Sequence, residues 1–242
     1  MSTLFPQWMN ALPGAVAVGL GAAGVGVIGG VWYYFTPSYW EVGYMPEQPV
    51  SFSHQIHAGQ LGIDCRYCHT NVEDASHANV PDTATCINCH AGDDQLGGYF
   101  NVDLWEAHKV NQDLVKVRTA YAEDTPIEWR RIHKVPDYAH FNHAVHLNAG
   151  VSCYSCHGRI DEMEVVYQTE SLSMGWCLEC HREPEKHLVD VDGVLDPENP
   201  VRITDLALVE KLLASPDQQE RGLALVETKQ LQPPEHCAAC HY

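Results

Sequence analysis

Residues 52–90 read FSHQIHAGQLGIDCRYCHTNVEDASHANVPDTATCINCH, and this stretch decides the fold. It contains one Phe-x-His-x-x-His pattern and two Cys-x-x-Cys-His motifs, at residues 65–69 and 86–90. In such a motif the two cysteines form thioether bonds to the vinyl groups of a haem, and the adjacent histidine is placed to bind the iron. The stretch therefore predicts two covalently attached haems.

A second copy occupies residues 141–181, which read FNHAVHLNAGVSCYSCHGRIDEMEVVYQTESLSMGWCLECH. Its motifs lie at residues 153–157 and 177–181, and a further motif lies at residues 237–241. We number these five motifs 1 to 5 in chain order. The repeat predicts that the protein contains a duplicated dihaem unit.

The five motifs contain all ten cysteines of the chain. Zinc ribbons, redox dithiols and disulfides also use paired cysteines, but none of them requires a histidine directly after the pair. We therefore expect five haems c. The expected attachment residues are Cys65, Cys68, Cys86, Cys89, Cys153, Cys156, Cys177, Cys180, Cys237 and Cys240, and the expected first axial ligands are His69, His90, His157, His181 and His241.

The second axial ligands should come from histidines outside the motifs. In Phe-x-His-x-x-His the two imidazoles are three residues apart, so they lie near one helical face but diverge enough to serve two irons. We expect His54, His57, His143 and His146 to be distal ligands, with His133 as the fifth. Met174 is the alternative to His133, since a thioether ligand would raise the potential of its haem.

Residues 1–40 carry no charged side chain, and residues 14–35 form an apolar run of 22 residues. As a helix this run would be about 33 Å long, enough to span a bilayer. A cleaved signal peptide is the competing interpretation, but it needs a basic segment at its start, and the first basic residue is Arg66. Because c-type haem is attached outside the cytoplasm, we expect a single-pass protein of the cytoplasmic (inner) membrane with a periplasmic haem domain.

The expected organisation has five parts. They are an anchor at 1–40, a linker and first dihaem unit at 41–92, a connecting segment at 93–132, a second dihaem unit at 133–189, and a helical segment with the fifth haem at 190–242. Little strand signal is present, so we expect a multihaem cytochrome c that is mainly helical and irregular, with haem as its core. Leu206, Val209 and Leu213 mark one helical stripe, and Ser215 resembles the N-cap of a second helix with Pro216 in its first turn. The formal charge of −18 disfavours nucleic acid as a partner.

Several segments outside the cysteines resemble the pentahaem cytochrome c component of alternative complex III. They are EVG at 41–43, PEQPV at 46–50, FSH at 52–54, LGIDCRYCH at 61–69, HKVPDY at 133–138, LSMGWC at 172–177 and PP at 233–234. The resemblance implies an electron-transfer subunit of a membrane quinol:electron-acceptor oxidoreductase without a catalytic site of its own. It also implies integral membrane subunits and an iron–sulfur protein as partners, and a soluble cytochrome c or similar acceptor.

Two enzyme hypotheses compete with this interpretation. The chain could be a self-contained, membrane-anchored multihaem quinol dehydrogenase, which also has one N-terminal helix and several haems. It could also be a multihaem reductase with an open iron position, although all five motifs retain their histidine and other histidines are plentiful.

Overall fold

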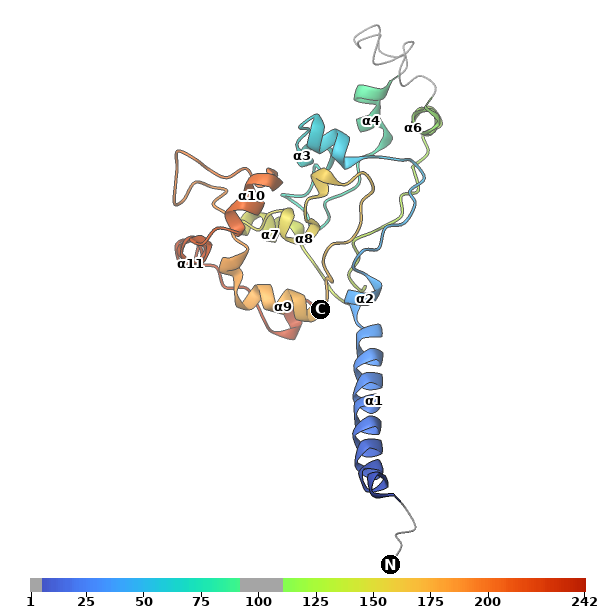
Figure 1. The fold of residues 1–242 in the computed structure, drawn as a ribbon. Helices are drawn as coiled ribbons and strands as arrows, with labels where there is room; N and C mark the ends of the chain where they lie inside the picture. Colours follow the sequence, from blue (N-terminus) through green and yellow to red (C-terminus); the bar gives the residue numbers. More distant parts are fainter. Residues whose placement is uncertain (1–5, 92–110) are drawn as a thin grey trace, which may run out of the picture.

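The computed structural model describes residues 6–91 and 111–242. Figure 1 shows a domain of short helices and loops that stands on one long N-terminal helix. Within the described ranges the only β-type pairing is an isolated antiparallel bridge between Val151 and Leu188. The prediction of a mainly helical and irregular domain with an N-terminal apolar helix is confirmed.

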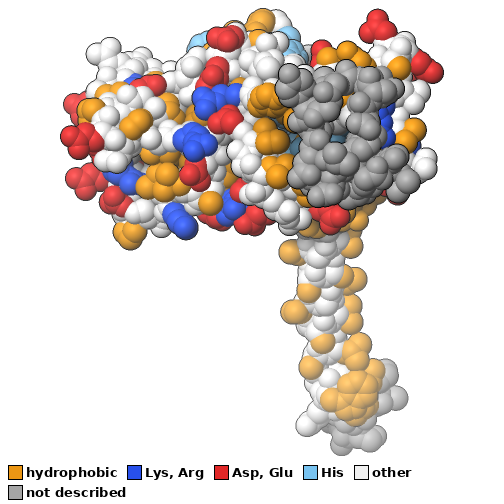
Figure 2. Space-filling view, turned by 90° about the horizontal axis from the view of Figure 1, so that it is seen from above, with side chains coloured by type: hydrophobic (Ala, Val, Ile, Leu, Met, Phe, Trp, Pro, Cys, Tyr) orange, Lys and Arg blue, Asp and Glu red, His pale blue; other side chains and the backbone are white. Residues whose placement is uncertain are grey.

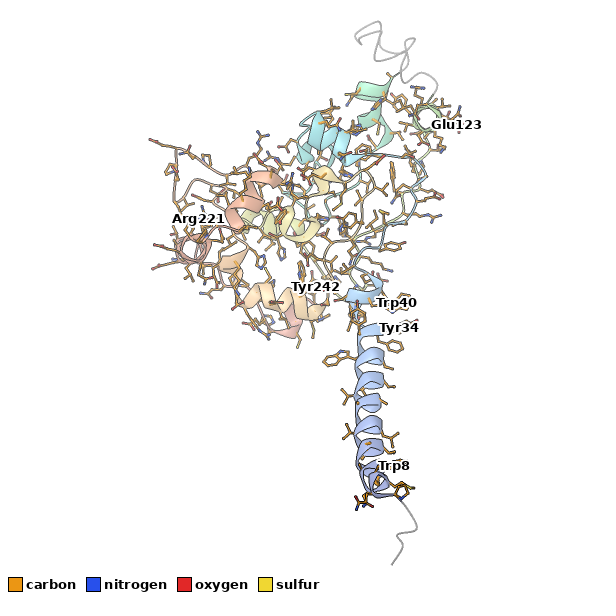
Figure 3. The ribbon with its side chains drawn as sticks, in the orientation of Figure 1. Trp8, Tyr34, Trp40, Glu123, Arg221 and Tyr242 are labelled. Atoms are coloured by element: carbon orange, nitrogen blue, oxygen red, sulfur yellow. The ribbon has the colours of Figure 1, made fainter. Side chains whose placement is uncertain are left out.

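The N-terminal helix α1 spans Leu12–Tyr34 and follows a 3-10 turn, η1, at Gln7–Ala11. Pro13 lies in its first turn, where a missing backbone N–H costs nothing. None of its residues is buried, and Figure 2 shows no acidic or basic side chain along it. The helical segment Gln7–Tyr34, which joins η1 to α1, has 28 residues and a mean hydropathy of 1.9, so it is long and apolar enough to cross a membrane. Figure 3 places Trp8 at one end of α1 and Tyr34 at the other, close to Trp40 at the end of the short helix α2 (Pro37–Trp40).

The two Phe-x-His-x-x-His patterns form helices of different types. The first gives η2, a π-helix at Gln55–Gln60, and the second gives the α-helix α7 at His143–Ala149. The five motifs lie on short helical segments. These are α3 (Cys65–Cys68), α4 (Thr83–His90), α8 (Tyr154–His157), α9 (Met174–Arg182) and the 3-10 turn η5 (Cys237–Ala239).

Buried apolar side chains are few and form separate small clusters. One cluster joins α4 to α6 (Gln112–Ala122) through Val50, Ile87 and Val117. Another contains Val72, Leu147 and Ile203. In the described part of the chain, fourteen hydrophobic residues are buried. So small a protein core fits the expectation that haem fills the space between the helices.

Two helices precede motif 5. In α10 (Leu206–Leu213) the side chains of Leu206 and Val209 are buried, as the predicted stripe requires, whereas its third member, Leu213, is half-buried. The predicted cap of the next helix is wrong, because α11 (Gln218–Thr228) begins at Gln218 and Ser215 instead donates to the Asp217 carboxylate. Contacts with a distant segment explain why α11 begins at Gln218. The buried Gln218 amide donates to the Glu185 carbonyl in the 3-10 turn η4 (Pro184–Lys186) and to the Leu188 carbonyl just after it, at 2.9 Å each. A further 3-10 turn, η3, occupies Ile160–Glu162. Residues 102–121 have a mixed amphipathic pattern that predicts a helix, and this segment lies partly outside the described residues.

Candidate functional site

One continuous cavity of about 3490 Å³ runs through the domain. A pocket for one small ligand usually has a volume of about 300–1,000 Å³, so this cavity has room for several. All ten cysteines and all five motif histidines line it. The ten thiols are free rather than paired in disulfides. The wall therefore presents the complete set of predicted attachment residues to a single space.

Burial keeps several of these thiols protonated. It raises the pKa of Cys156 to about 12 and that of Cys180 to about 11. A reactive dithiol or a zinc site needs thiolates, which are formed when the pKa is lowered. Among the described residues no group of three or more His, Cys, Asp or Glu side chains has metal-binding geometry.

Local capping positions three of the motifs. The side chain of Asp64 accepts a hydrogen bond from the Arg66 N–H at the start of α3, and Asp82 accepts one from the Thr85 N–H in α4. Ser173 does the same in α9 for the Trp176 N–H. Such caps fix where each short helix begins, and hence where its two cysteines point.

Backbone carbonyls orient three of the five motif histidines. The Nδ1 atom of His69 donates to the Asn79 carbonyl at 2.7 Å, that of His181 to the Pro234 carbonyl at 2.7 Å, and that of His241 to the Tyr138 carbonyl at 2.8 Å. A bond of this kind places the ring proton on Nδ1 and leaves Nε2 with a free lone pair, as a metal-binding imidazole requires. The donor set therefore fits haem iron.

The second histidine of each pair lies opposite the second motif of its own unit. The ring centres of His57 and His90 are 6.0 Å apart, and those of His146 and His181 are 6.1 Å apart. Two imidazole nitrogens that each lie about 2 Å from one metal ion are about 4 Å apart, which puts their ring centres about 6 Å apart. Both observed spacings match this value.

Each of these two histidines is held in the same way. The Nδ1 atom of His57 donates to the Ser53 carbonyl at 2.8 Å, and that of His146 donates to the Asn142 carbonyl at 2.7 Å, four residues back in both cases. The ring of Phe52 stacks on His57 with their centres 4.3 Å apart, and the ring of Phe141 stacks on His146 with their centres 4.5 Å apart. The shared phenylalanine thus fixes the ring plane of the second histidine.

The first histidines of the pairs lie near the centre of the domain. The Nδ1 atom of His143 donates to the Ser76 carbonyl at 2.8 Å, whereas the buried Nδ1 atom of His54 has no hydrogen-bond partner in the described structure. Burial, reinforced by neighbouring histidines, lowers the pKa of His54 to about 4. Its imidazole is therefore neutral at physiological pH, the form that binds iron.

His133 also lies in this central region. Its ring centre is 4.1 Å from that of His157 in motif 3, and the two rings share a hydrogen bond of 3.2 Å. Burial lowers its pKa to about 4 as well. The structure thus brings His133 to motif 3 rather than to motif 5.

The surroundings of motif 5 differ from those of the other four. The ring beside His241 is that of Tyr138, at 5.8 Å, and His140 stacks on Tyr242 at 4.2 Å. Met174 and His140 both line the cavity, and Met174 is 67% exposed. The sequence predicted Met174 as a candidate ligand but not His140. The one sequence feature that could have indicated His140 is its position two residues after Tyr138.

Backbone contacts dock each His-pair helix on the opposite unit. The N–H of Gln55, one residue after His54, donates to the Met163 carbonyl at 3.0 Å, six residues after His157. The N–H of Ala144, one residue after His143, donates to the Ala75 carbonyl at 3.2 Å, six residues after His69. We call this arrangement the reciprocal docking. Sequence reasoning missed it, because backbone donors and acceptors leave no mark in the side-chain pattern.

Comparison with known proteins agrees with this geometry. Residues 50–113 match a family described as cytochrome c7 and related cytochrome c. The chain is also 30% identical over 162 residues to the multihaem cytochrome c subunit of menaquinone reductase from Nitratidesulfovibrio vulgaris (strain Hildenborough). The aligned region covers 59% of this chain and 70% of that protein.

Proposed function

The chain belongs to the multihaem cytochromes c, and from this premise we propose that it is the electron-transfer subunit of a membrane quinol:electron-acceptor oxidoreductase. It carries five haems c and has no catalytic site of its own. The observation that carries the proposal is the single cavity whose wall holds all ten cysteines, the five motif histidines and the five predicted distal histidines. Haem supplies one-electron redox chemistry, and the residues described above attach it, orient it and ligate its iron.

The ligand geometry supports transfer rather than catalysis. We assign His57 as the partner of His90, and His146 as the partner of His181, from their ring spacings of 6.0 and 6.1 Å. His54, His143 and His133 lie around motifs 1 and 3 and are three candidates for the two distal positions there, so one of them is left for another role, and Met174 and His140 are the candidates beside motif 5. An iron with two imidazole ligands has no open position for a substrate, and its ligands do not rearrange when it gains an electron.

The finer assignment is the pentahaem cytochrome c component of alternative complex III, with the five-part organisation given by residues 1–40, 41–92, 93–132, 133–189 and 190–242. Helix α1 supports a single-pass anchor, and the attachment chemistry supports a periplasmic domain. In this assignment electrons pass from an iron–sulfur partner, associated with integral membrane subunits, towards a soluble cytochrome c or similar acceptor.

The name of the relative favours a second direction of electron flow. That protein belongs to a menaquinone reductase. In a complex of that type this chain would pass electrons towards quinone instead of away from quinol. The two directions use the same haem-binding residues and differ in the partners.

Co-purification from detergent-solubilised membranes tests the proposal. A pyridine haemochrome assay should give five haems for this chain, one for each motif. The isolated chain should be inactive with quinol, and the complex should be active. Full quinol oxidation by the chain alone would replace the proposal with the self-contained quinol dehydrogenase. Comparing quinol oxidation with quinone reduction in the same complex settles the direction.

A further inference from the structure

We propose that the five attachment motifs are ordered in space as 2–1–3–4–5, so that motif 1, the first in sequence, is interior and motif 2 is an end of the row. The inference rests on the proposed five-haem electron carrier and specifies the route through it. It follows from contacts between motifs.

The centre of the row is the junction of motifs 1 and 3. The reciprocal docking ties the segment after each of these motifs to the His-pair helix of the other unit. The Cys65 and Cys153 thiols, the first of motifs 1 and 3, interact so that the pKa of Cys65 is lowered and that of Cys153 is raised, which agrees with this junction. The two units therefore meet through their first motifs, and their second motifs lie on the outside.

The outer links join the motifs within each unit. In the first unit the Asn88 amide of motif 2 donates to the Tyr67 hydroxyl of motif 1 at 3.3 Å, and Cys68 is an electrostatic neighbour of Cys89. In the second unit the Val151 N–H, two residues before motif 3, donates to the His146 carbonyl at 3.0 Å, and the ring centre of His146 lies 6.1 Å from that of His181 in motif 4. Motif 2 thus extends from motif 1, and motif 4 extends from motif 3.

Motif 5 continues the row from motif 4. The Nδ1 atom of His181 donates to the carbonyl of Pro234, three residues before motif 5. The next residue, Arg182, pairs with Glu235 at 2.9 Å. Cys177 has Cys240 as an electrostatic neighbour. These three contacts of motif 5 and its approach all lead to motif 4.

The row is inclined along the direction of α1. In Figure 1, α4 with motif 2 lies at the end of the domain farthest from α1, whereas α9 with motif 4 lies near the level of α2. Figure 3 places Tyr242, next to motif 5, close to the level of Trp40, and Glu123 at the end of α6 far above it. Motif 5 is thus the end nearest the membrane side, and motif 2 is the end farthest from it.

Flash photoreduction of full-length holo-protein tests the order. A ruthenium photoreductant is attached through Gln232→Cys, an exposed position close to motif 5. One variant loses haem 1 (Cys65→Ser with Cys68→Ser), and its matched control loses haem 2 (Cys86→Ser with Cys89→Ser). The readout is how many of the four remaining haems are reduced in the fast phase.

The proposed order predicts opposite results for the two variants. Loss of haem 1 should isolate haem 2, so three of four haems are reduced rapidly and the fourth is slower by more than an order of magnitude. Loss of haem 2 should leave all four connected. If the haems followed the sequence order, these two results would be exchanged, and the proposal would be overturned, as it would be if both variants behaved alike.

A second measurement covers the case in which a variant does not mature. Iron positions from anomalous diffraction of the intact holo-protein should give iron 1 two neighbours, irons 2 and 3. An iron 2 to iron 3 distance shorter than the iron 1 to iron 3 distance would refute the order. Neither measurement uses quinol or a partner, so the order and the proposed function can fail separately. A haem count below five on the unmodified chain would instead refute the proposed function.

Discussion

The two predicted dihaem units keep the same ring geometry on different backbones. In both, the phenylalanine stacks on the second histidine, with interplanar angles of 25° and 30°, and meets the first edge-on, at 88° and 85°. Yet the first pair begins a π-helix and the second an α-helix. Because the rings agree while the helix types differ, the comparison indicates that the ring geometry is held more strictly than the helix type, as the proposed iron ligation would require.

The units differ where each helix meets the other unit. Gly59, two residues after His57, lies so close to the Asp161 carbonyl that a Cβ atom would be 2.2 Å from that oxygen. Its counterpart, Asn148, uses a side chain for the same contact and donates to the Glu73 carbonyl at 3.3 Å. One unit therefore docks by close backbone approach and the other by a side-chain hydrogen bond.

Replacing the second histidine should have the largest effect and should be equal in the two units. In His57→Ala and in His146→Ala we expect one haem of the five to change from low spin to high spin, because its second imidazole is gone. Covalent attachment should be unchanged. Electron paramagnetic resonance gives the spin state, and a haemochrome assay gives the haem count. The exposed His77→Ala is the control, and two altered haems in either variant would contradict the assigned pairs.

Substitutions at the docking contacts should affect the units unequally. Gly59→Ala forces a shift against a backbone carbonyl and should cost about 1–3 kcal/mol of unfolding free energy. Asn148→Ala removes one neutral hydrogen bond at an exposed position and should cost about 0.5–1.5 kcal/mol at most. Denaturant unfolding of the holo-protein measures both. Gly175→Ala, whose new Cβ would meet nothing within 4 Å, is the matched control. Equal losses at both sites would show that the docking is not tighter at Gly59.

Removing the stacked rings should have a smaller and more similar effect. Phe52→Leu and Phe141→Leu keep an apolar side chain but remove the ring contact, which contributes about 0.5–1.5 kcal/mol beyond the buried area. Because Phe141 is 37% exposed, its loss should be the smaller of the two. Thermal unfolding followed by haem absorption measures the difference. A larger loss for Phe141→Leu would contradict the ranking by burial.

The residue that precedes the first motif is Asp64 in one unit and Ser152 in the other. The contributions of these two residues to stability should therefore depend on pH in different ways. Asp64 accepts a hydrogen bond from Thr204 at 2.8 Å, whereas its counterpart Ser152 donates to the Ile203 carbonyl at 2.7 Å. The Arg66 guanidinium holds the pKa of Asp64 well below its usual range. The unfolded chain, with a normal carboxyl pKa of about 3.9, therefore binds this proton more readily than the folded chain. The stabilisation by Asp64 is present above about pH 4 and is lost as the pH falls further.

Unfolding free energy measured against pH tests this difference. Asp64→Asn should reduce stability above about pH 4 and should flatten the acid limb of the curve. The ion pair is partly exposed, so the loss should be about 1 kcal/mol or less. Ser152→Ala should lower the unfolding free energy by an amount that does not change with pH, because a hydroxyl does not titrate. An unchanged acid limb in Asp64→Asn would assign the acid sensitivity to other groups.

The sequence predicted the elements whose cause is local. The apolar run gave α1 within two residues at each end, and the stripe of α10 placed Leu206 and Val209 in the interior. The start of α11 was not predictable in this way, because Gln218 is fixed by carbonyls about thirty residues away. The position of His133 beside His157 and the contact between Cys65 and Cys153 also depend on how the two units meet. Spacing along the chain carries no information about that meeting.

The reciprocal docking also implies an order of events during biogenesis, because its contacts form only when both units are present. Residues 52–90 reach the periplasm before residues 141–181 in the proposed orientation, and the acceptor for the Gln55 N–H belongs to the later segment. Until that segment arrives the first unit lacks this docking contact, so we expect its cysteines to be more accessible than in the complete chain. A chain that lacks its second unit should therefore be more sensitive to protease than the complete chain.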